Sequence, residues 1–278
     1  TVEDYFAAKM RLFTDVMAPG GVAVLNADAR EYPESAQLCR DRGHRVFSYG
    51  RHGANLRVVG HKPNGTGQYI ELDFEGNKHS LRVPLVGEFQ GWNALCALGL
   101  VVGAGADPEA AVAALSNLKG VPGRVQEVAE LNGGRVFIDY AHTPDALESC
   151  LRALRPHARN RLTVVFGCGG GRDRGKRPEM GRIACKFADR IVVTDDNPRQ
   201  EDPARIRAEV LAGCDRAVEI PGRAEAIRVA VGGLDSGDVL LIAGKGHETE
   251  QIIGDEVLPF DDAVCAQAAA EEVARVGA

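Results

Sequence analysis

Helical and extended hydrophobic patterns follow one another along the first part of the chain. Apolar residues recur with the helical period at Tyr5, Ala8 and Leu12, which predicts a helix over residues 2–17. Continuous or alternating apolar runs predict strands at 21–25, 45–49, 54–59, 68–74 and 80–85, and longer periodic runs predict helices at 33–40, 88–102 and 108–118. Turn-forming residues separate the last three strands, so we expect them to form a β-meander.

A regular alternation of strands and helices begins after Val121-Pro122-Gly123. The pattern predicts a hairpin over 124–139, strands at 162–166, 190–194 and 239–242, and helices at 144–155, 178–188, 203–212, 223–231 and 262–276. Helical runs of about ten residues between strands are typical of right-handed crossovers in a mostly parallel sheet. We therefore expect an α/β protein with two domains, residues 1–121 and 122–278, of which the second is Rossmann-like.

The composition is that of a globular protein. The 278 residues include 33 Lys and Arg against 39 Asp and Glu, a net charge of −6, and 45% are hydrophobic. This balance excludes general disorder and a uniformly basic surface for nucleic acid, and no apolar run approaches the roughly 18 residues of a membrane span. Seven cysteines without a CxxC pair indicate reduced thiols. We expect a cytoplasmic protein without a zinc site or a disulfide framework.

Three polar segments follow predicted strands, where parallel sheets bind their ligands. Residues 167–177 combine five glycines with four cations ahead of a helix, which favours an anion, although a flexible solvated loop remains the alternative. The segment is not a Walker A loop, because Arg177 stands where that motif needs Ser or Thr.

The other two segments suit an amino acid. Asp196, Asn197, Pro198 and Arg199 follow the strand at 190–194. An arginine binds a carboxylate and an aspartate binds an ammonium group, but a helix-capping turn is an equally open reading. Residues 244–248 offer glycines for close approach and Glu248 for an amine, with a surface turn as the alternative.

Three further residues could be either functional or structural when they are judged from the sequence pattern alone. Asp139 and His142 lie in a strand-to-helix turn, where capping and packing would also explain them. Lys9 lies in the middle of the first predicted helix, where a lysine is normally a solvated charge.

Taken together, these segments resemble the Mur ligases of peptidoglycan synthesis over essentially the whole chain. The resemblance lies in YFAAKMRLF at 5–13, DYAHTPDALE at 139–148, FGCGGGRDRGKRPEM at 166–180 and DNPR at 196–199. It implies that Lys9 is carbamylated and binds Mg²⁺, and that Asn93, Arg124, Asp139 and His142 serve the ATP site. Gln90 and Gln126 stand where the family usually has Asn and Glu.

The resemblance also implies a substrate. The DNPR form is associated in this family with meso-diaminopimelate, which differs from lysine by a second carboxylate. The implied pocket consists of Arg172, Asp196, Asn197, Pro198, Arg199, Gly244 and Glu248. The implied reaction uses ATP to phosphorylate the D-glutamyl carboxylate of UDP-MurNAc-L-Ala-D-Glu, and the diaminopimelate amine then attacks the acyl phosphate.

One family motif is missing from the printed sequence. The glycine-rich GTNGKT loop that holds ATP phosphates in the family does not occur. We therefore expect residues 1–121 to be the second half of a central domain, to have an unprotected sheet edge, and the chain to be inactive alone. A non-catalytic amino-acid-binding module and a ligase like folylpolyglutamate synthetase are the alternatives.

Overall fold

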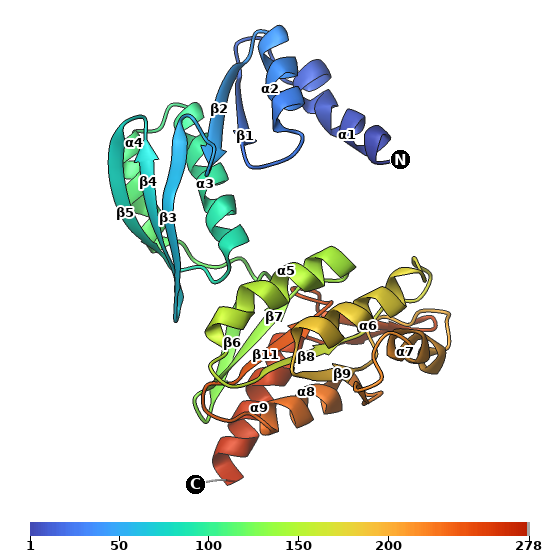
Figure 1. Cartoon of the computed structure of the whole chain (residues 1–278). Helices are drawn as coiled ribbons and strands as arrows, with labels where there is room; N and C mark the ends of the chain where they lie inside the picture. Colours follow the sequence, from blue (N-terminus) through green and yellow to red (C-terminus); the bar gives the residue numbers. More distant parts are fainter. Residues whose placement is uncertain (277–278) are drawn as a thin grey trace. The chain divides into compact units, whose positions relative to one another are not determined.

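The computed structural model describes residues 1–276, and the chain divides into two compact units. Unit 1 is Thr1–Lys119, and unit 2 begins at Gly120 (Figure 1). Each unit has its own sheet and its own hydrophobic core.

Unit 1 opens with a helix whose last turn is widened. Helix α1 (Val2–Arg11) starts from a capping box made by Thr1 and Asp4, and it runs into a π-helical turn at Leu12–Val16. The predicted helix over 2–17 is thus confirmed, with a change to π geometry near its end. None of the α1 residues is buried.

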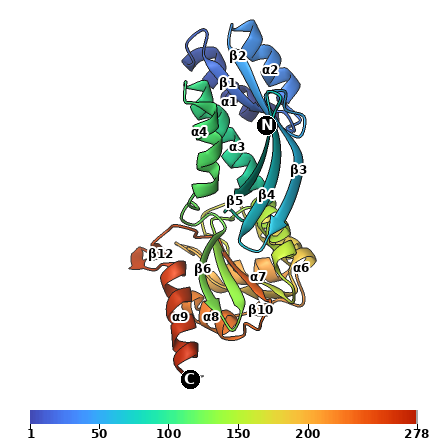
Figure 2. The ribbon, with the colours of Figure 1, turned by 90° about the vertical axis from the view of Figure 1, so that its left-hand side faces the viewer.

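A five-stranded sheet forms the rest of unit 1 together with three helices. The strands stand in the order β1-β2-β3-β4-β5, with β1 at one edge, and the antiparallel β3-β4-β5 confirms the predicted meander. Figure 2 shows α3 and α4 beside these strands. The bounds are β1 (Val22–Asn26), α2 (Tyr32–Asp41), β2 (Arg45–Gly50), β3 (Leu56–Asn64), β4 (Gly67–Phe74), β5 (Asn77–Val83), α3 (Glu88–Gly103) and α4 (Pro108–Ala114).

Unit 2 contains a six-stranded sheet in the order β10-β9-β8-β11-β7-β6. Every neighbouring pair is parallel except β6 with β7, so the mostly parallel sheet predicted from the sequence is confirmed. Strand β11 lies between β7 and β8. The bounds are β6 (Gln126–Leu131), β7 (Gly134–Asp139), β8 (Leu162–Phe166), β9 (Arg190–Val193), β10 (Val218–Glu219) and β11 (Val239–Ala243).

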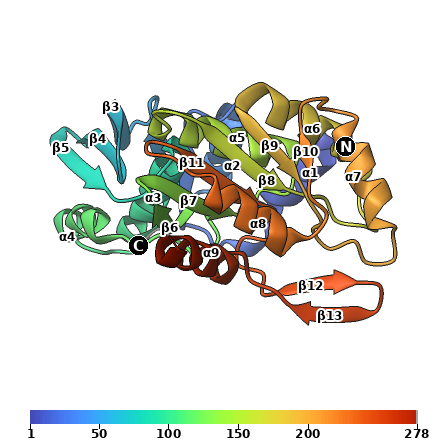
Figure 3. The same ribbon diagram turned by 90° about the horizontal axis from the view of Figure 1, so that it is seen from below.

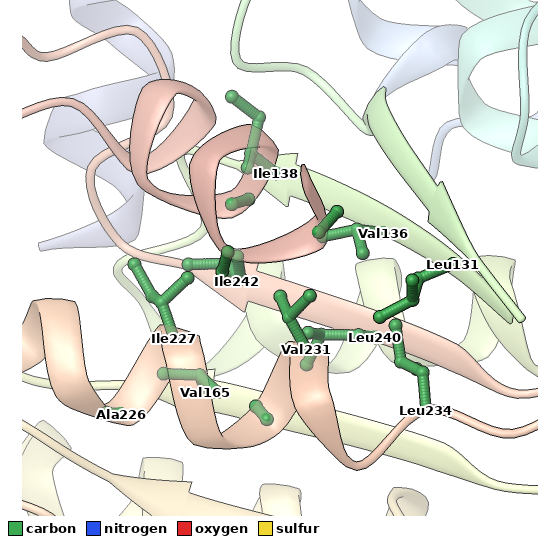
Figure 4. Packing of buried hydrophobic residues seen from close by; sticks show 14 of the residues in the cluster. Leu131, Val136, Ile138, Val165, Ala226, Ile227, Val231, Leu234, Leu240 and Ile242 are labelled. Atoms are coloured by element: carbon green, nitrogen blue, oxygen red, sulfur yellow. The ribbon is translucent and has the colours of Figure 1, made fainter. Parts of the chain in front are cut away.

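Helices cover both faces of this sheet. Figure 1 shows α5 and α6 on one face and α8 and α9 on the other. On the second face, Val165, Leu240 and Ile242 pack against Ile227 and Val231 of α8 (Figure 4). The bounds are α5 (Pro144–Leu154), α6 (Lys176–Phe187), α7 (Pro203–Leu211), α8 (Arg223–Gly232) and α9 (Asp262–Val276).

Several local features differ from the sequence prediction; for example, the short strand β10 was not predicted, and α4 ends at Ala114 rather than at residue 118. Helix α6 begins at Lys176 rather than Pro178, because a proline in the first turn removes only an N–H that has no partner inside the helix. The sequence analysis also missed the antiparallel hairpin of β12 (Glu250–Ile253) and β13 (Glu256–Pro259), a separate two-stranded sheet that projects to one side in Figure 3. Among the described residues, no helix combines the length and apolarity needed to cross a membrane.

Candidate functional site

The segments after β8, β9 and β11 meet at the carboxyl edge of the unit 2 sheet. The N–H of Gly170 donates to the Asn197 carbonyl oxygen over 2.9 Å, and Arg199 Nη1 donates to the Gly170 carbonyl oxygen over 2.9 Å. Asn197 Nδ2 donates to Glu248 Oε2 over 3.2 Å. The sheet order explains this meeting, because β9, β8 and β11 are neighbours.

Asn197 is the best-connected side chain of this cluster, and it is buried. Its Oδ1 accepts from Lys245 Nζ over 2.8 Å and from the N–H of Ile252 over 3.0 Å. With the bond to Glu248, the amide is held from two parts of the chain, the loop after β11 and strand β12. Its orientation is therefore fixed before any ligand binds.

Lys245 is a buried cation that the sequence analysis did not place in the site. Its side chain has no exposed surface, and its Nζ donates to Asn197 and to the Glu250 carbonyl oxygen over 2.6 Å. Glu248 Oε2 lies 3.9 Å from the same nitrogen. Burial lowers the pKa of Lys245, and the nearby carboxylates oppose that shift. Only its position between two glycines hinted at such a role.

Arg199 joins the DNPR segment to the β12 hairpin. It has a left-handed backbone conformation, φ +51°, and its N–H donates to the Ile252 carbonyl oxygen over 3.0 Å. Gly170 lies so close to the Pro198 carbonyl oxygen that a Cβ there would approach it to 1.9 Å. The guanidinium donates through Nη1 to the carbonyl oxygens of Gly170 and Asn197, and its other nitrogens have no protein acceptor among residues 1–276.

Asp196 and Gly244 lie against a buried ion pair. The Arg223 guanidinium is fully buried and binds both oxygens of Asp262, over 2.7 and 2.6 Å. Its Nη1 lies 4.0 Å from Asp196 Oδ2. Gly244 has φ +119°, and a Cβ there would come within 2.6 Å of Asp196 Oδ2. A side chain at position 244 would therefore displace the Asp196 carboxylate.

Most of the positive charge in the glycine-rich loop is bound internally, contrary to the anion-binding role expected for all four cations. Arg177 is buried and pairs with Glu201 and Glu209, over 3.1 and 2.7 Å. Arg174 also pairs with Glu201 over 3.0 Å, and Lys176 donates to the His142 carbonyl oxygen over 2.7 Å. These internal partners favour packing over ligand binding for three of the four cations.

Arg172 and Glu201 differ in their partners: Glu201 is paired with arginines of the glycine-rich loop, whereas Arg172 forms no ion pair within residues 1–276. Arg172 is exposed, and it is the cation of this loop that keeps no protein partner among the described residues. For Glu201, hydrogen bonding by Arg177 lowers the pKa to about 2. Arg172 is therefore the loop's available cation for a ligand.

The predicted nucleotide residues of unit 2 fall into two groups. Asp139 is buried, its Oδ2 accepts from the N–H of Val125 over 2.8 Å, and burial raises its pKa. Arg124 and His142 are exposed, and both lie against Tyr140, with the Arg124 guanidinium 4.9 Å from the ring centroid. Asp139 thus holds the backbone, while Arg124, His142 and Tyr140 present a cation and two rings.

The predicted residues of unit 1 are both exposed. Lys9 Nζ lies 5.2 Å from the Tyr5 ring centroid, beside a groove of about 870 Å³ between α1 and the start of α2. Asn93 Nδ2 donates to Gln90 Oε1 over 3.2 Å within α3. Within residues 1–276, no three His, Cys, Asp or Glu side chains gather closely enough to hold a metal ion.

Both units match one protein family. The Mur ligase middle domain matches residues 1–101, and the Mur ligase glutamate ligase domain matches residues 123–246. The chain therefore belongs to the Mur ligase family, which confirms the resemblance seen in the sequence.

Individual relatives narrow the comparison. A Bradyrhizobium diazoefficiens protein named UDP-N-acetylmuramoyl-L-alanyl-D-glutamate--2,6-diaminopimelate ligase is 49% identical over 266 residues, which cover 94% of this chain and 55% of the relative. A solved structure of a ligase of the same name is 35% identical with a TM-score of 0.68, covering 98% of this chain and 57% of the other. The chain spans about half the length of the curated relatives it matches.

A third comparison shows the fold alone. The Mycobacterium tuberculosis folylpolyglutamate synthase, solved with ADP, is 23% identical with a TM-score of 0.65 and covers 80% of this chain and 52% of its own. The two proteins share an architecture at this level of identity.

Proposed function

We propose that this chain is part of an ATP-dependent ligase that joins meso-diaminopimelate to UDP-MurNAc-L-Ala-D-Glu. The observation that carries the proposal is the cluster of Asn197, Arg199 and Glu248, which combines amide and guanidinium donors with one carboxylate at the carboxyl edge of the sheet. The names of the similar ligases support the same substrates.

The charges of the cluster fit a diaminoacid with two carboxylates. Arg199 and Arg172 supply cations for carboxylate groups, and Glu248 supplies an acceptor for an ammonium group. Lysine has no second carboxylate, so it would lose charge-assisted hydrogen bonds worth about 1.5–3 kcal/mol each. Asp196, Pro198 and Gly244 shape the pocket around these groups, because Gly244 leaves room for the Asp196 carboxylate.

The proposed reaction balances as an amide synthesis. The D-glutamyl carboxylate accepts the terminal phosphoryl group of ATP, and the diaminopimelate amine displaces phosphate from the acyl phosphate, giving the amide, ADP and phosphate. Arg124 and the rings of Tyr140 and His142 are placed to bind a nucleotide by charge and stacking. Asp139 would hold the backbone of Val125 in place. The role of Asn93 in binding the nucleotide stays a prediction.

The magnesium proposal rests on Lys9 alone in this chain. A lysine ammonium repels Mg²⁺, so Lys9 fits the metal only as a carbamate, which supplies an anionic oxygen. Among residues 1–276, no group of three His, Cys, Asp or Glu side chains is gathered that could complete the coordination of the ion. The nucleotide substrates and the seven free thiols favour the cytoplasm as the compartment.

A non-catalytic amino-acid-binding module is the second candidate, because the printed sequence lacks a phosphate-binding GxxxxGK[ST] loop. An assay of ADP release separates the two. The complete gene product should release ADP only when both substrates are present, whereas the 278-residue chain alone should release none. A complete product that binds diaminopimelate without any ADP release would favour the binding module.

Calorimetric titration tests the substrate directly. Meso-diaminopimelate should bind the chain. L-lysine should bind at least about tenfold more weakly than meso-diaminopimelate, and the Arg199→Ala variant should bind meso-diaminopimelate at least about tenfold more weakly than the wild-type chain does. Arg228→Ala is the matched control, since Arg228 forms an exposed ion pair with Glu225 on α8. Equal binding of lysine and diaminopimelate would refute the substrate assignment.

A further inference from the structure

We propose that Lys245 is a positioning residue that fixes which face of the Asn197 amide meets the ligand and that ties the β12 hairpin to the amino-acid site. The inference rests on the proposed function, because it concerns the same site. The side chain of Lys245 is completely buried, so it forms no surface ion pair, and it is not among the residues proposed to contact the ligand.

The hydrogen bonds determine the amide orientation. Asn197 Oδ1 accepts from two donors, Lys245 Nζ at 2.8 Å and the Ile252 N–H at 3.0 Å. A flipped amide would set its NH₂ group against these two donors, which leaves all of them without acceptors. The amide nitrogen must therefore point toward Glu248, where it donates over 3.2 Å.

This orientation has a consequence for recognition. The amide nitrogen carries two N–H groups, and the second has no acceptor among the described residues. Asn197 thus offers a donor to a ligand carboxylate, next to the acceptor that Glu248 offers to an ammonium group. If the amide flipped, its oxygen would face the Glu248 carboxylate and repel the ligand carboxylate.

Lys245 also connects the hairpin to the site. Its Nζ donates to the Glu250 carbonyl oxygen over 2.6 Å, at the start of β12. Further along this strand, Gln251 Nε2 donates to the Asp196 carbonyl oxygen over 2.7 Å, and the Ile252 carbonyl oxygen accepts from the Arg199 N–H over 3.0 Å. The Lys245 ammonium group therefore holds the Asn197 amide and also holds strand β12, whose Ile252 N–H is the second donor to the Asn197 oxygen.

A double-mutant cycle tests this role by calorimetry on the full chain with meso-diaminopimelate. Lys245→Met should weaken binding roughly 10- to 100-fold, as expected for losing a charge-assisted hydrogen bond in the site. In an Asn197→Ala background the same change should cost less than about twofold, because Lys245 acts through the amide. Lys186→Met, which changes an exposed lysine of α6, should leave binding unchanged.

The binding results can contradict the proposed role of Lys245 in several ways. A folded Lys245→Met protein that binds within twofold of wild type, or effects that add fully in the double mutant, would overturn the inference. If Lys245→Met does not fold, Lys245→Gln replaces it as a variant that retains an N–H donor to the amide. It should weaken diaminopimelate binding less than Asn197→Ala does, and an equal or greater loss would overturn the inference. Failure of the wild-type chain to bind diaminopimelate would instead count against the proposed function.

A readout without ligand completes the test. The Asn197 Nδ2 proton that bonds Glu248 should be protected from hydrogen exchange in wild type, because the amide is buried and the two bonds to its oxygen hold it in this orientation. In Lys245→Met this protection should fall by at least about tenfold, as for the loss of one hydrogen bond to a charged group. Unchanged protection would show that the amide is held without Lys245.

Discussion

Replacing Arg223 with methionine should destabilise unit 2 strongly. The change removes a fully buried guanidinium that binds both oxygens of Asp262, which also has no exposed surface. An unpaired buried carboxylate costs about 3–5 kcal/mol, and the carbonyl oxygens of Ala243 and Asp195 each lose a hydrogen bond from Arg223. We expect the free energy of unfolding of unit 2 to fall by about 5 kcal/mol.

Urea denaturation followed by far-ultraviolet circular dichroism measures this loss. Trp92 is the only tryptophan in the chain and lies in unit 1, so its fluorescence follows the other unit in the same samples. The fluorescence midpoint should stay in place while the component of the dichroism transition from unit 2 moves to lower urea.

Two further variants serve as a control and as a rescue for Arg223→Met. Arg228→Met changes another arginine of α8 whose ion pair is about half exposed, with 53% of the Arg228 side chain accessible, and it should cost less than about 1 kcal/mol. Arg223→Met with Asp262→Leu removes both charges and should recover most of the loss. A loss below about 1 kcal/mol for Arg223→Met, or an equal loss for Arg228→Met, would refute the argument.

Three further predictions concern glycine, pH and the sheet edge. Gly123→Ala should lower the melting temperature far more than Gly171→Ala, because both have positive φ but only a Cβ at 123 meets backbone, 2.3 Å from the His247 nitrogen; similar losses would contradict this. The pKa of Glu201 is about 2 in the folded chain against 4.5 ordinarily, so its stabilising effect is present above pH 4.5 and is lost as the pH falls toward 2. The stability difference between wild type and Glu201→Gln should therefore narrow over that range in acid unfolding, and a constant difference would contradict the pairing with Arg177. Because β1 is an edge strand, sedimentation should show association that grows with concentration, whereas a single monomeric species throughout would argue against an unprotected edge.

The sequence predicted the main strands because their signals are strong and local. Buried parallel strands such as β8 and β11 are continuous apolar runs between turns, and the structure places them within about one residue of the predicted bounds. The β12 hairpin lacked such a signal, since residues 250–259 mix charged and apolar side chains and several of the apolar ones are exposed. Its position depends on hydrogen bonds to residues about 50 positions away, which no local pattern encodes.

The sequence indicated which segments form the candidate site, but it did not indicate every residue that contributes to it. The sequence predicted a common site for Asn197, Arg199 and Glu248 because each follows a strand. In the structure the sheet order brings those strand ends together. Arg223 and Lys245 were missed because charged residues are normally exposed, and only tertiary structure shows that both are buried. The same reason explains Arg177, whose charge suggested a ligand but is satisfied by Glu201 and Glu209.

The position of β11 bears on how unit 2 forms during translation. This strand pairs with both β7 and β8, yet it spans residues 239–243 of a 278-residue chain. Until the ribosome has released it, β7 and β8 have no shared neighbour, and each presents an unpaired apolar edge. The central sheet therefore closes late, and stalled or shortened chains that end before Val239 should depend on chaperones to avoid aggregation.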